Sequence, residues 1–285
     1  QNTFRGKMAA DPALPAGQVE PDGRQRWFSL DEVNTLRRKL RPRGKTLMPR
    51  RPGGRVEAVL LNTAGGITDG DQLNYAVGAT DGAVVTATTQ ASEKVYRSRC
   101  GDSQVGCQLN VSGGAFLEWL PQETILFDGA ALARKTDIVI DGDSELIALD
   151  WLVLGRLASG EHLTNATVHD RWRVRREGEL IWADDFRLRG NIEDLRQRPS
   201  LLDGAKAMAT LIYVAANASD HLEPVRDLLQ QTSSRAGVST RPGLLICRFL
   251  GHEPMALRRD VEKFLLAFRA TLRNGTCPLP RVWAC

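Results

Sequence analysis

Histidine and cysteine are scarce in this chain of 285 residues, which contains four of the first and five of the second. No two cysteines follow the spacing C-x-x-C, and no two histidines follow H-x₃-H. Structural zinc sites and other permanent metal cages are built on such local spacings, so the sequence argues against both. The odd number and irregular spacing of the cysteines also argue against a disulfide framework. We therefore expect a reducing compartment and a cytoplasmic location.

Long apolar runs are lacking as well, since the longest fall short of the roughly 18–20 residues needed to cross a bilayer. Residues 1–18 carry no continuous apolar segment of the kind found in a secretory signal. The net charge of +4 is too small to indicate nucleic-acid binding by itself. The sequence therefore predicts a globular protein that has neither a membrane nor a nucleic acid as its partner.

Positive charge is concentrated between residues 37 and 55. One interpretation is a surface for an anionic partner, and the other, which we favour, is a solvated strand edge whose basic side chains prevent aggregation. The residues concerned are Arg37, Arg38, Lys39, Arg41, Arg43, Lys45, Arg50, Arg51 and Arg55. Residues 1–24 contain Pro, Gly and small polar residues without periodicity, so we expect a flexible arm there, followed by a single domain over residues 25–285.

Apolar and polar residues alternate over much of the chain between residues 56 and 190. In residues 104–111, the side chains of Val105, Cys107, Leu109 and Val111 alternate with polar residues or glycine, as in a half-buried strand. Glycine-containing turns separate such runs at irregular intervals, which favours many short strands without a strict sequence repeat. Further strand-like runs are Val56–Asn62, Val84–Thr89, Ala115–Leu120, Asp137–Ile140 and Glu145–Leu154.

The pattern becomes helical after residue 200. Residues 219–231 and 254–273 each place their apolar side chains on one face of a helix. Pro224 falls in the first turn of the earlier segment, where proline is tolerated. The sequence therefore predicts a mainly β protein with two α-helices near its C-terminal end.

Signatures of enzymes are missing from the sequence. It contains no G-x-S-x-G, no Walker A sequence, no H-E-x-x-H and no G-x-G-x-x-G after a strand. His162 and His169 could each serve as a base or a metal ligand of a hydrolase or lyase, but we favour satisfied surface histidines. A catalytic triad assembled from distant residues would leave no local pattern. We predict that the protein is not an enzyme.

The run Leu61–Leu73 (LNTAGGITDGDQL) is unusual because three glycines and two acids lie between two strand-like segments. Glycines permit positive φ angles, so the loop can be tight or can line a passage. Asp69 and Asp71 offer oxygen ligands suited to divalent cations. The alternative is a hairpin turn in which the aspartates bond to their own backbone. Composition alone favours the hairpin.

Charged residues also occur inside apolar runs. Alternation allows Glu118 to point outward, because Leu117 and Trp119 point the other way. Asp150 lies in a run that is apolar on both faces, which indicates a strand covered on both sides. A carboxylate in such a place costs several kcal/mol, of order 3–5, unless it is paired or solvated. We therefore consider an interior polar role for Asp150.

Four motifs, in this order, resemble the urease accessory protein D family (UreD, also called UreH). They are Leu61–Leu73, Thr88–Ser98 (TTQASEKVYRS), Leu117–Asp128 (LEWLPQETILFD) and Leu149–Glu161 (LDWLVLGRLASGE). The hairpin at residues 171–188 and the ending LPRVW at residues 279–283 are also similar. The combination is specific although no single motif is, and it extends from about residue 25 to the end of the chain.

The resemblance implies a layered, β-helix-like arrangement of many strands with two helices. It also implies a non-enzymatic, nickel-delivering chaperone for urease. The partners would be the urease apoprotein, the helical accessory protein F and, through it, the GTPase protein G that carries nickel. Nickel(II) would pass through the protein, and no tightly bound cofactor is expected.

Carried over to this sequence, the resemblance implies that Asp71, Glu93 and Asp150 line the nickel conduit. The family usually has two adjacent acids at the first of these steps, whereas here Gln72 follows Asp71. Asp69 is a further candidate, and Arg156 and Glu161 belong either to the conduit or to a structural ion pair. Dispersed carboxylates suit an ion in transit, since they replace water ligands and still release the ion. The alternative function is a pure adaptor that never contacts the metal.

Overall fold

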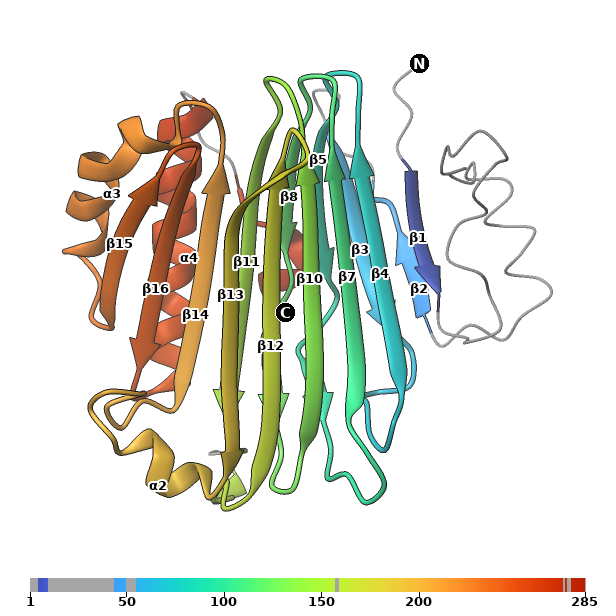
Figure 1. Cartoon of the computed structure of the whole chain (residues 1–285), viewed down its shortest axis with the longest axis vertical. Helices are drawn as coiled ribbons and strands as arrows, with labels where there is room; N and C mark the ends of the chain where they lie inside the picture. The colour runs from blue at the N-terminus through green and yellow to red at the C-terminus, as the bar shows by residue number, and fades with distance from the viewer. Residues whose placement is uncertain are drawn as a thin grey trace.

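The structure is a computed structural model that describes residues 5–9, 44–49, 55–156, 159–273, 275 and 278–284. Within these residues the strands form a six-stranded and a ten-stranded sheet (Figure 1). The six-stranded sheet consists, in spatial order, of β1 (Arg5–Ala9), β4 (Gln72–Ala79), β7 (Ser103–Val111), β10 (Ala131–Ile140), β12 (Ala166–Arg176) and β13 (Glu179–Gly190).

The ten-stranded sheet faces the first one. Its main path consists of β15 (Arg235–Arg241), β16 (Leu244–Gly251), β14 (Ala207–Val214), β11 (Glu145–Leu154), β8 (Phe116–Leu120), β5 (Val84–Thr89), β3 (Val56–Asn62) and β2 (Gly44–Leu47). Two short strands, β6 (Glu93–Val95) and β9 (Thr124–Leu126), pair with each other, and β9 also pairs with β11.

The chain alternates between the two sheets and winds as a solenoid. Strands β3, β5, β8 and β11 run parallel in the ten-stranded sheet, and β4, β7, β10 and β12 run parallel in the six-stranded sheet. Each strand of the first set is followed by one of the second set. This stacking confirms the predicted β-helix-like arrangement, which short alternating strands and glycine turns favour because no helix lies between them.

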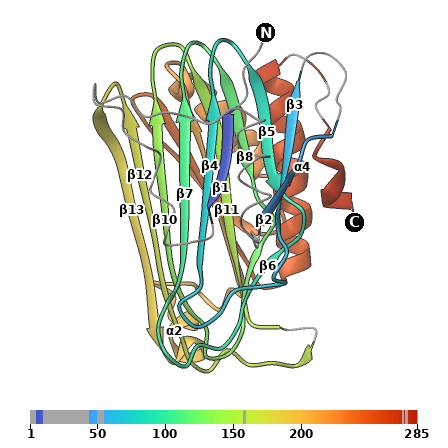
Figure 2. The same cartoon turned by 90° about the vertical axis from the view of Figure 1, so that its right-hand side faces the viewer.

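Helices form a third layer on the outer face of the ten-stranded sheet (Figure 2). They are α3 (Leu222–Leu229), preceded by the 3₁₀ turn η2 (Ala218–His221), and α4 (Pro254–Arg273). A last 3₁₀ turn, η3 (Arg281–Ala284), also packs there through Trp283. One apolar core therefore lies between the sheets, and a second lies between the ten-stranded sheet and the helices.

The predicted helices occur where the sequence places them. The bounds of α4 agree with the prediction, whereas α3 is shorter than residues 219–231 because its first residues form η2. A short helix that the apolar pattern does not announce, α2 (Ile192–Arg196), begins after Asn191, whose side chain accepts a hydrogen bond from the amide of Asp194. No helix in the described part of the chain is both long and apolar enough to span a bilayer.

Two predictions concern the N-terminal part of the chain. Within the predicted flexible arm, Arg5–Ala9 forms β1, which pairs antiparallel with β4, and the rest of residues 1–24 lies outside the described residues. Of the basic cluster at residues 37–55, the structure describes Lys45 in β2 and Arg55, and the other basic residues lie outside it. Both interpretations of the cluster stay predictions.

Candidate functional site

The four sequence motifs meet at one end of the solenoid. Each contributes the connection from a strand of the ten-stranded sheet to a strand of the six-stranded sheet: residues 63–71, 90–102, 121–130 and 155–165, which we call the end loops. Because the parallel strands stack coil by coil, their connections stack as well. Motifs that are about 30 residues apart in the sequence therefore become spatial neighbours.

Backbone hydrogen bonds hold each end loop to the next. Ile67 forms a bridge to Val95 between the first two loops, and Arg97 forms one to Ala130 between the second and the third. The amide of Gly129 donates to the carbonyl of Asn165 at 2.7 Å, which joins the third loop to the fourth. The loops thus form one continuous layer beneath the strands.

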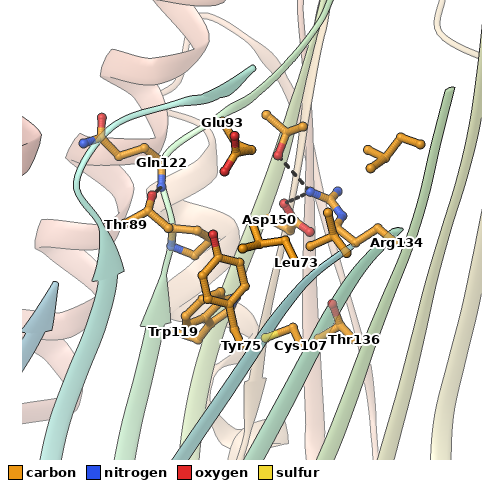
Figure 3. A pocket seen from close by; sticks show the side chains of 14 residues that line it. Leu73, Tyr75, Thr89, Glu93, Cys107, Trp119, Gln122, Arg134, Thr136 and Asp150 are labelled. Atoms are coloured by element: carbon orange, nitrogen blue, oxygen red, sulfur yellow. Dashed lines mark hydrogen bonds and ion pairs between the residues drawn. The ribbon is translucent and has the colours of Figure 1, made fainter. Parts of the chain in front are cut away.

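A small cavity lies between the two sheets, beside the end loops (Figure 3). Its volume is about 40 Å³, and an ordered water molecule requires roughly 10–15 Å³. Glu93 of β6 and Asp150 of β11 both line it, and Arg134 of β10 reaches in from the six-stranded sheet. The structure therefore brings together two of the three residues predicted to line a conduit.

Asp150 is 7% exposed and faces the six-stranded sheet, as the apolar run around it predicts. Its Oδ1 atom lies 2.7 Å from an Nη1 atom of Arg134, and it also accepts a hydrogen bond from the amide of Trp151 at 2.8 Å. Burial raises the pKa of the Asp150 carboxyl, and the neighbouring Arg134 charge opposes this rise. The residue thus has the interior polar role that the sequence suggests.

Glu93 occupies the partly exposed side of the cavity lining. Its two carboxylate oxygens accept hydrogen bonds from the side-chain amide of Asn62 at 3.0 and 3.1 Å. Burial raises the pKa of Glu93 to about 7, against the opposing effect of the Asn62 hydrogen bonds. A carboxyl of this pKa releases its proton readily when a cation replaces it.

Arg134 is a site residue that the sequence interpretation missed. Its guanidinium binds Asp150, donates to both carboxylate oxygens of Asp170 at 3.1 and 2.7 Å, and donates to the Thr124 hydroxyl at 3.0 Å. The two carboxylates raise its pKa although burial acts in the opposite direction. The sequence feature that could have revealed it is the alternation in residues 131–140, which places Arg134 on the same face as the buried Leu132 and Ile138.

The cavity offers oxygen ligands and no ionised thiol. Cys107 of β7 lines it, but burial raises the pKa of this thiol well above its usual range, so it stays protonated. Tyr75 lines it too, and burial raises the pKa of its hydroxyl in the same way. Among the residues that the structure describes, no three His, Cys, Asp or Glu side chains gather in a geometry that could hold a metal ion.

Asp69 and Asp71, the acids of the glycine-rich motif, bond to backbone amides in the end loops. Asp69 has a φ of +40° and accepts from the amides of Arg99 and Cys100 and from the Ser98 hydroxyl. These bonds lower the pKa of Asp69, with the amide of Arg99 contributing most. Asp71 accepts from the amide of Thr68 at 3.1 Å and is not part of the cavity lining. A conduit role for either stays a prediction.

Arg156 and Glu161 form a bidentate ion pair in the fourth end loop. Their contacts are 3.0 Å from Nη2 to Oε1 and 3.2 Å from Nε to Oε2, and the guanidinium also lies over the ring of Phe127 at 4.3 Å. This geometry agrees with the structural reading of the pair. His162 is exposed, and His169 contacts Asp185 at 2.8 Å on the outer face of β12, as expected for surface histidines.

Comparison with known proteins gives the family. The model of the UreD urease accessory protein family matches residues 35–284. The chain belongs to the UreD family of urease accessory proteins. Proteins named urease accessory protein UreD are similar to it from Xanthobacter autotrophicus, 44% identical over 92% of this chain and 86% of that protein, and from Azorhizobium caulinodans, 39% identical over 92% of each. The UreD protein of a Methylobacterium strain is 38% identical over 98% of this chain and 94% of its own length.

Membership in the UreD family assigns the chain to urease maturation. It also means that the cavity belongs to an accessory protein, whose partners are parts of the urease machinery.

Proposed function

We propose that this protein is a non-enzymatic, cytoplasmic chaperone that delivers nickel to urease, and that the ion passes through the cavity between its two sheets. Glu93 and Asp150 are the carboxylates that the ion meets on this path. The partners are the urease apoprotein, the accessory protein F and, through F, the GTPase protein G. Nickel is cargo here, and the protein holds no resident metal.

One observation carries this proposal: two carboxylates from different coils line one small cavity inside an otherwise apolar core. Buried carboxylates are costly and are retained where they are paired or functional. Asp150 has a partner in Arg134, but Glu93 is bonded to a neutral amide from Asn62. An acid that is hydrogen-bonded to a neutral amide and lines a cavity can replace a water ligand of a passing ion and then release the ion.

The alternative is an adaptor that assembles the partners without contacting nickel. Under that function the cavity acids would matter only for folding. The surrounding geometry favours the conduit, because apolar side chains of similar size would fill this space at lower cost than acids do. The two functions differ in whether a neutral isostere of these acids still delivers nickel.

The experiment compares D150N, E93Q and D137N. The first two remove a carboxylate charge from the cavity while they keep its shape. D137N makes the same change on β10 at the outer face, where Asp137 pairs with Lys135 at 2.7 Å. Each variant is co-expressed with the urease apoprotein and proteins F and G, and both the recovered complex and the nickel content of urease are measured.

We expect all three variants to assemble, D150N and E93Q to lower the nickel content of urease, and D137N to leave it unchanged. If D150N and E93Q assemble and urease still receives its full nickel content, the conduit fails and the adaptor function stands. The same series with D71N tests the prediction for Asp71, whose carboxylate caps the Thr68 amide.

A further inference from the structure

One buried arginine beside the cavity pairs with two buried aspartates. Arg134 is a single cation between two aspartates, Asp150 of the ten-stranded sheet and Asp170 of the six-stranded sheet, at 2.7 Å from each. All three side chains are buried. Arginine keeps its proton in proteins, so this positive charge is present at every physiological pH. The guanidinium therefore occupies the ligand oxygens that a divalent cation would use.

We propose that Arg134 is a tethered cation that keeps the cavity from retaining a divalent metal ion. This inference rests on the proposed function and assigns to Arg134 the control of affinity along the path. Without the guanidinium, Asp150 would line the cavity together with Glu93 and without its neighbouring positive charge, and carboxylate oxygens are ligands that divalent cations prefer. With it, an arriving ion shares Asp150 with a fixed positive charge and is repelled by that charge.

The geometry of Arg134 suits this role better than a purely structural one. Arg269, by comparison, binds both carboxylate oxygens of Glu118 and so ties α4 to the sheet. Arg134 instead binds one acid from each sheet, and its side chain also lines the cavity. The arginine is thus placed where a passing ion would meet it (Figure 3).

The test measures nickel affinity on the full chain with NiCl₂ as the only ligand, by titration calorimetry. The variant is R134Q, which removes the charge and keeps a polar side chain. We expect R134Q to bind Ni²⁺ at least about tenfold more tightly than the unaltered chain. R134K, which keeps the charge, stays within about threefold of the unaltered chain, and R134Q/D150N loses the gain. A gain that came from cysteine or histidine side chains exposed by a damaged fold would persist in R134Q/D150N.

R173Q is the matched control. Arg173 pairs with Asp185 on the outer face of β12, so the substitution removes the same charge away from the cavity. We expect no change in nickel affinity. An R134Q variant that folds and binds nickel no more tightly than R173Q overturns the inference, and so does an R134K variant that gains as much as R134Q.

Maturation of urease gives a second readout. A site that retains nickel fills once nickel is in excess. With R134Q, the nickel content of urease should therefore be lowered at limiting nickel and return to the normal level at excess nickel. If R134Q does not fold, R134Q/D170N replaces it, because it removes the cation together with one of its acids. An affinity of this double variant above that of the unaltered chain supports the inference, and an equal or lower affinity overturns it.

The two proposals fail separately. Unchanged nickel affinity in R134Q overturns the role of Arg134 even if D150N stops delivery. Full delivery by D150N and E93Q overturns the conduit even if R134Q gains affinity.

Discussion

The ten-stranded sheet has a buried acid on each of its faces, and the two acids are treated differently. On the helix face, Glu118 of β8 is 2% exposed and meets Arg269 of α4 in a bidentate pair at 2.6 and 2.9 Å, and it also accepts a hydrogen bond from the Thr86 hydroxyl. On the face toward the six-stranded sheet, Asp150 shares Arg134 with Asp170 and lines a cavity together with Glu93. In the first arrangement one guanidinium binds both oxygens of one acid, and in the second one guanidinium is shared by two acids beside a cavity.

The comparison shows that buried charge by itself does not identify a site. Both acids lie in parallel strands that are covered on both sides, and both have an arginine partner. They differ in how the arginine is used, because Arg269 binds both oxygens of Glu118, whereas Arg134 is shared by Asp150 and Asp170 at the edge of a cavity. The Glu118–Arg269 pair fixes α4 to the sheet, whereas under the proposed function the acids that line the cavity exchange their partner for a passing ion.

Glu118→Gln should have the largest effect on stability. It leaves the buried Arg269 without its carboxylate, and breaking a buried ion pair from one side costs about 3–5 kcal/mol. Urea denaturation of the unaltered chain and the variant measures the loss. A loss below about 1 kcal/mol, the range of surface pairs, would remove the distinction between the two faces.

Glu93 should give the stability a pH dependence. Its folded pKa of about 7 lies above the value of 4.5 in the unfolded chain, so the folded state binds more protons between these values. Stability therefore falls as the pH rises through this range, by about 2 kcal/mol between pH 5 and pH 7. In E93Q this contribution is absent, so urea denaturation at both pH values should show a smaller fall. An equal fall in both chains contradicts the prediction.

Asp150→Asn should cost less than Glu118→Gln, about 1 kcal/mol. Arg134 keeps both hydrogen bonds to Asp170, so its charge stays compensated. Burial also raises the pKa of Asp150, so a neutral side chain such as Asn is less unfavourable at this position than it would be at the surface. Urea denaturation of D150N beside E118Q checks the order, and a loss in D150N as large as in E118Q would mean that the cavity acid is structural.

Asp137→Asn should have the smallest effect, below about 1 kcal/mol. Its partner Lys135 is half exposed on the outer face of β10, where water screens the pair. The variant makes the same chemical change as D150N on a strand of the facing sheet, so it shows how much of any effect comes from the change of residue type. Thermal unfolding of both variants gives the comparison, and a larger shift in D137N than in D150N would contradict it.

Much of the fold could be predicted from the sequence. Alternation in residues 104–111 and apolar residues on both faces of residues 145–154 gave β7 and β11, and the helical stripe gave α4. Alternation with Leu117 and Trp119 allowed Glu118 to point outward, but the side chain is 2% exposed because α4 covers this face of the sheet. Which segment covers a strand is decided by contacts between residues far apart, here 151 positions from Glu118 to Arg269.

The candidate site was predicted in part. Asp150 was found because a charge inside a doubly apolar run has no exposed side to occupy, and Glu93 came from the resemblance of its motif. Arg134 was missed because the strand was expected only from Asp137, although β10 begins at Ala131. The pairing of Arg134 with acids from both sheets depends on how the coils stack, which no local pattern contains.

The most direct test of the conduit fills the cavity and leaves every charge in place. Thr136 of β10 lines the cavity and is 2% exposed, so Thr136→Leu places additional carbon atoms beside Glu93 and Asp150. The measurement is the nickel content of urease matured by the assembled T136L complex. We predict that T136L assembles with its partners and delivers less nickel. Full nickel loading by an assembled T136L complex would contradict passage between the sheets.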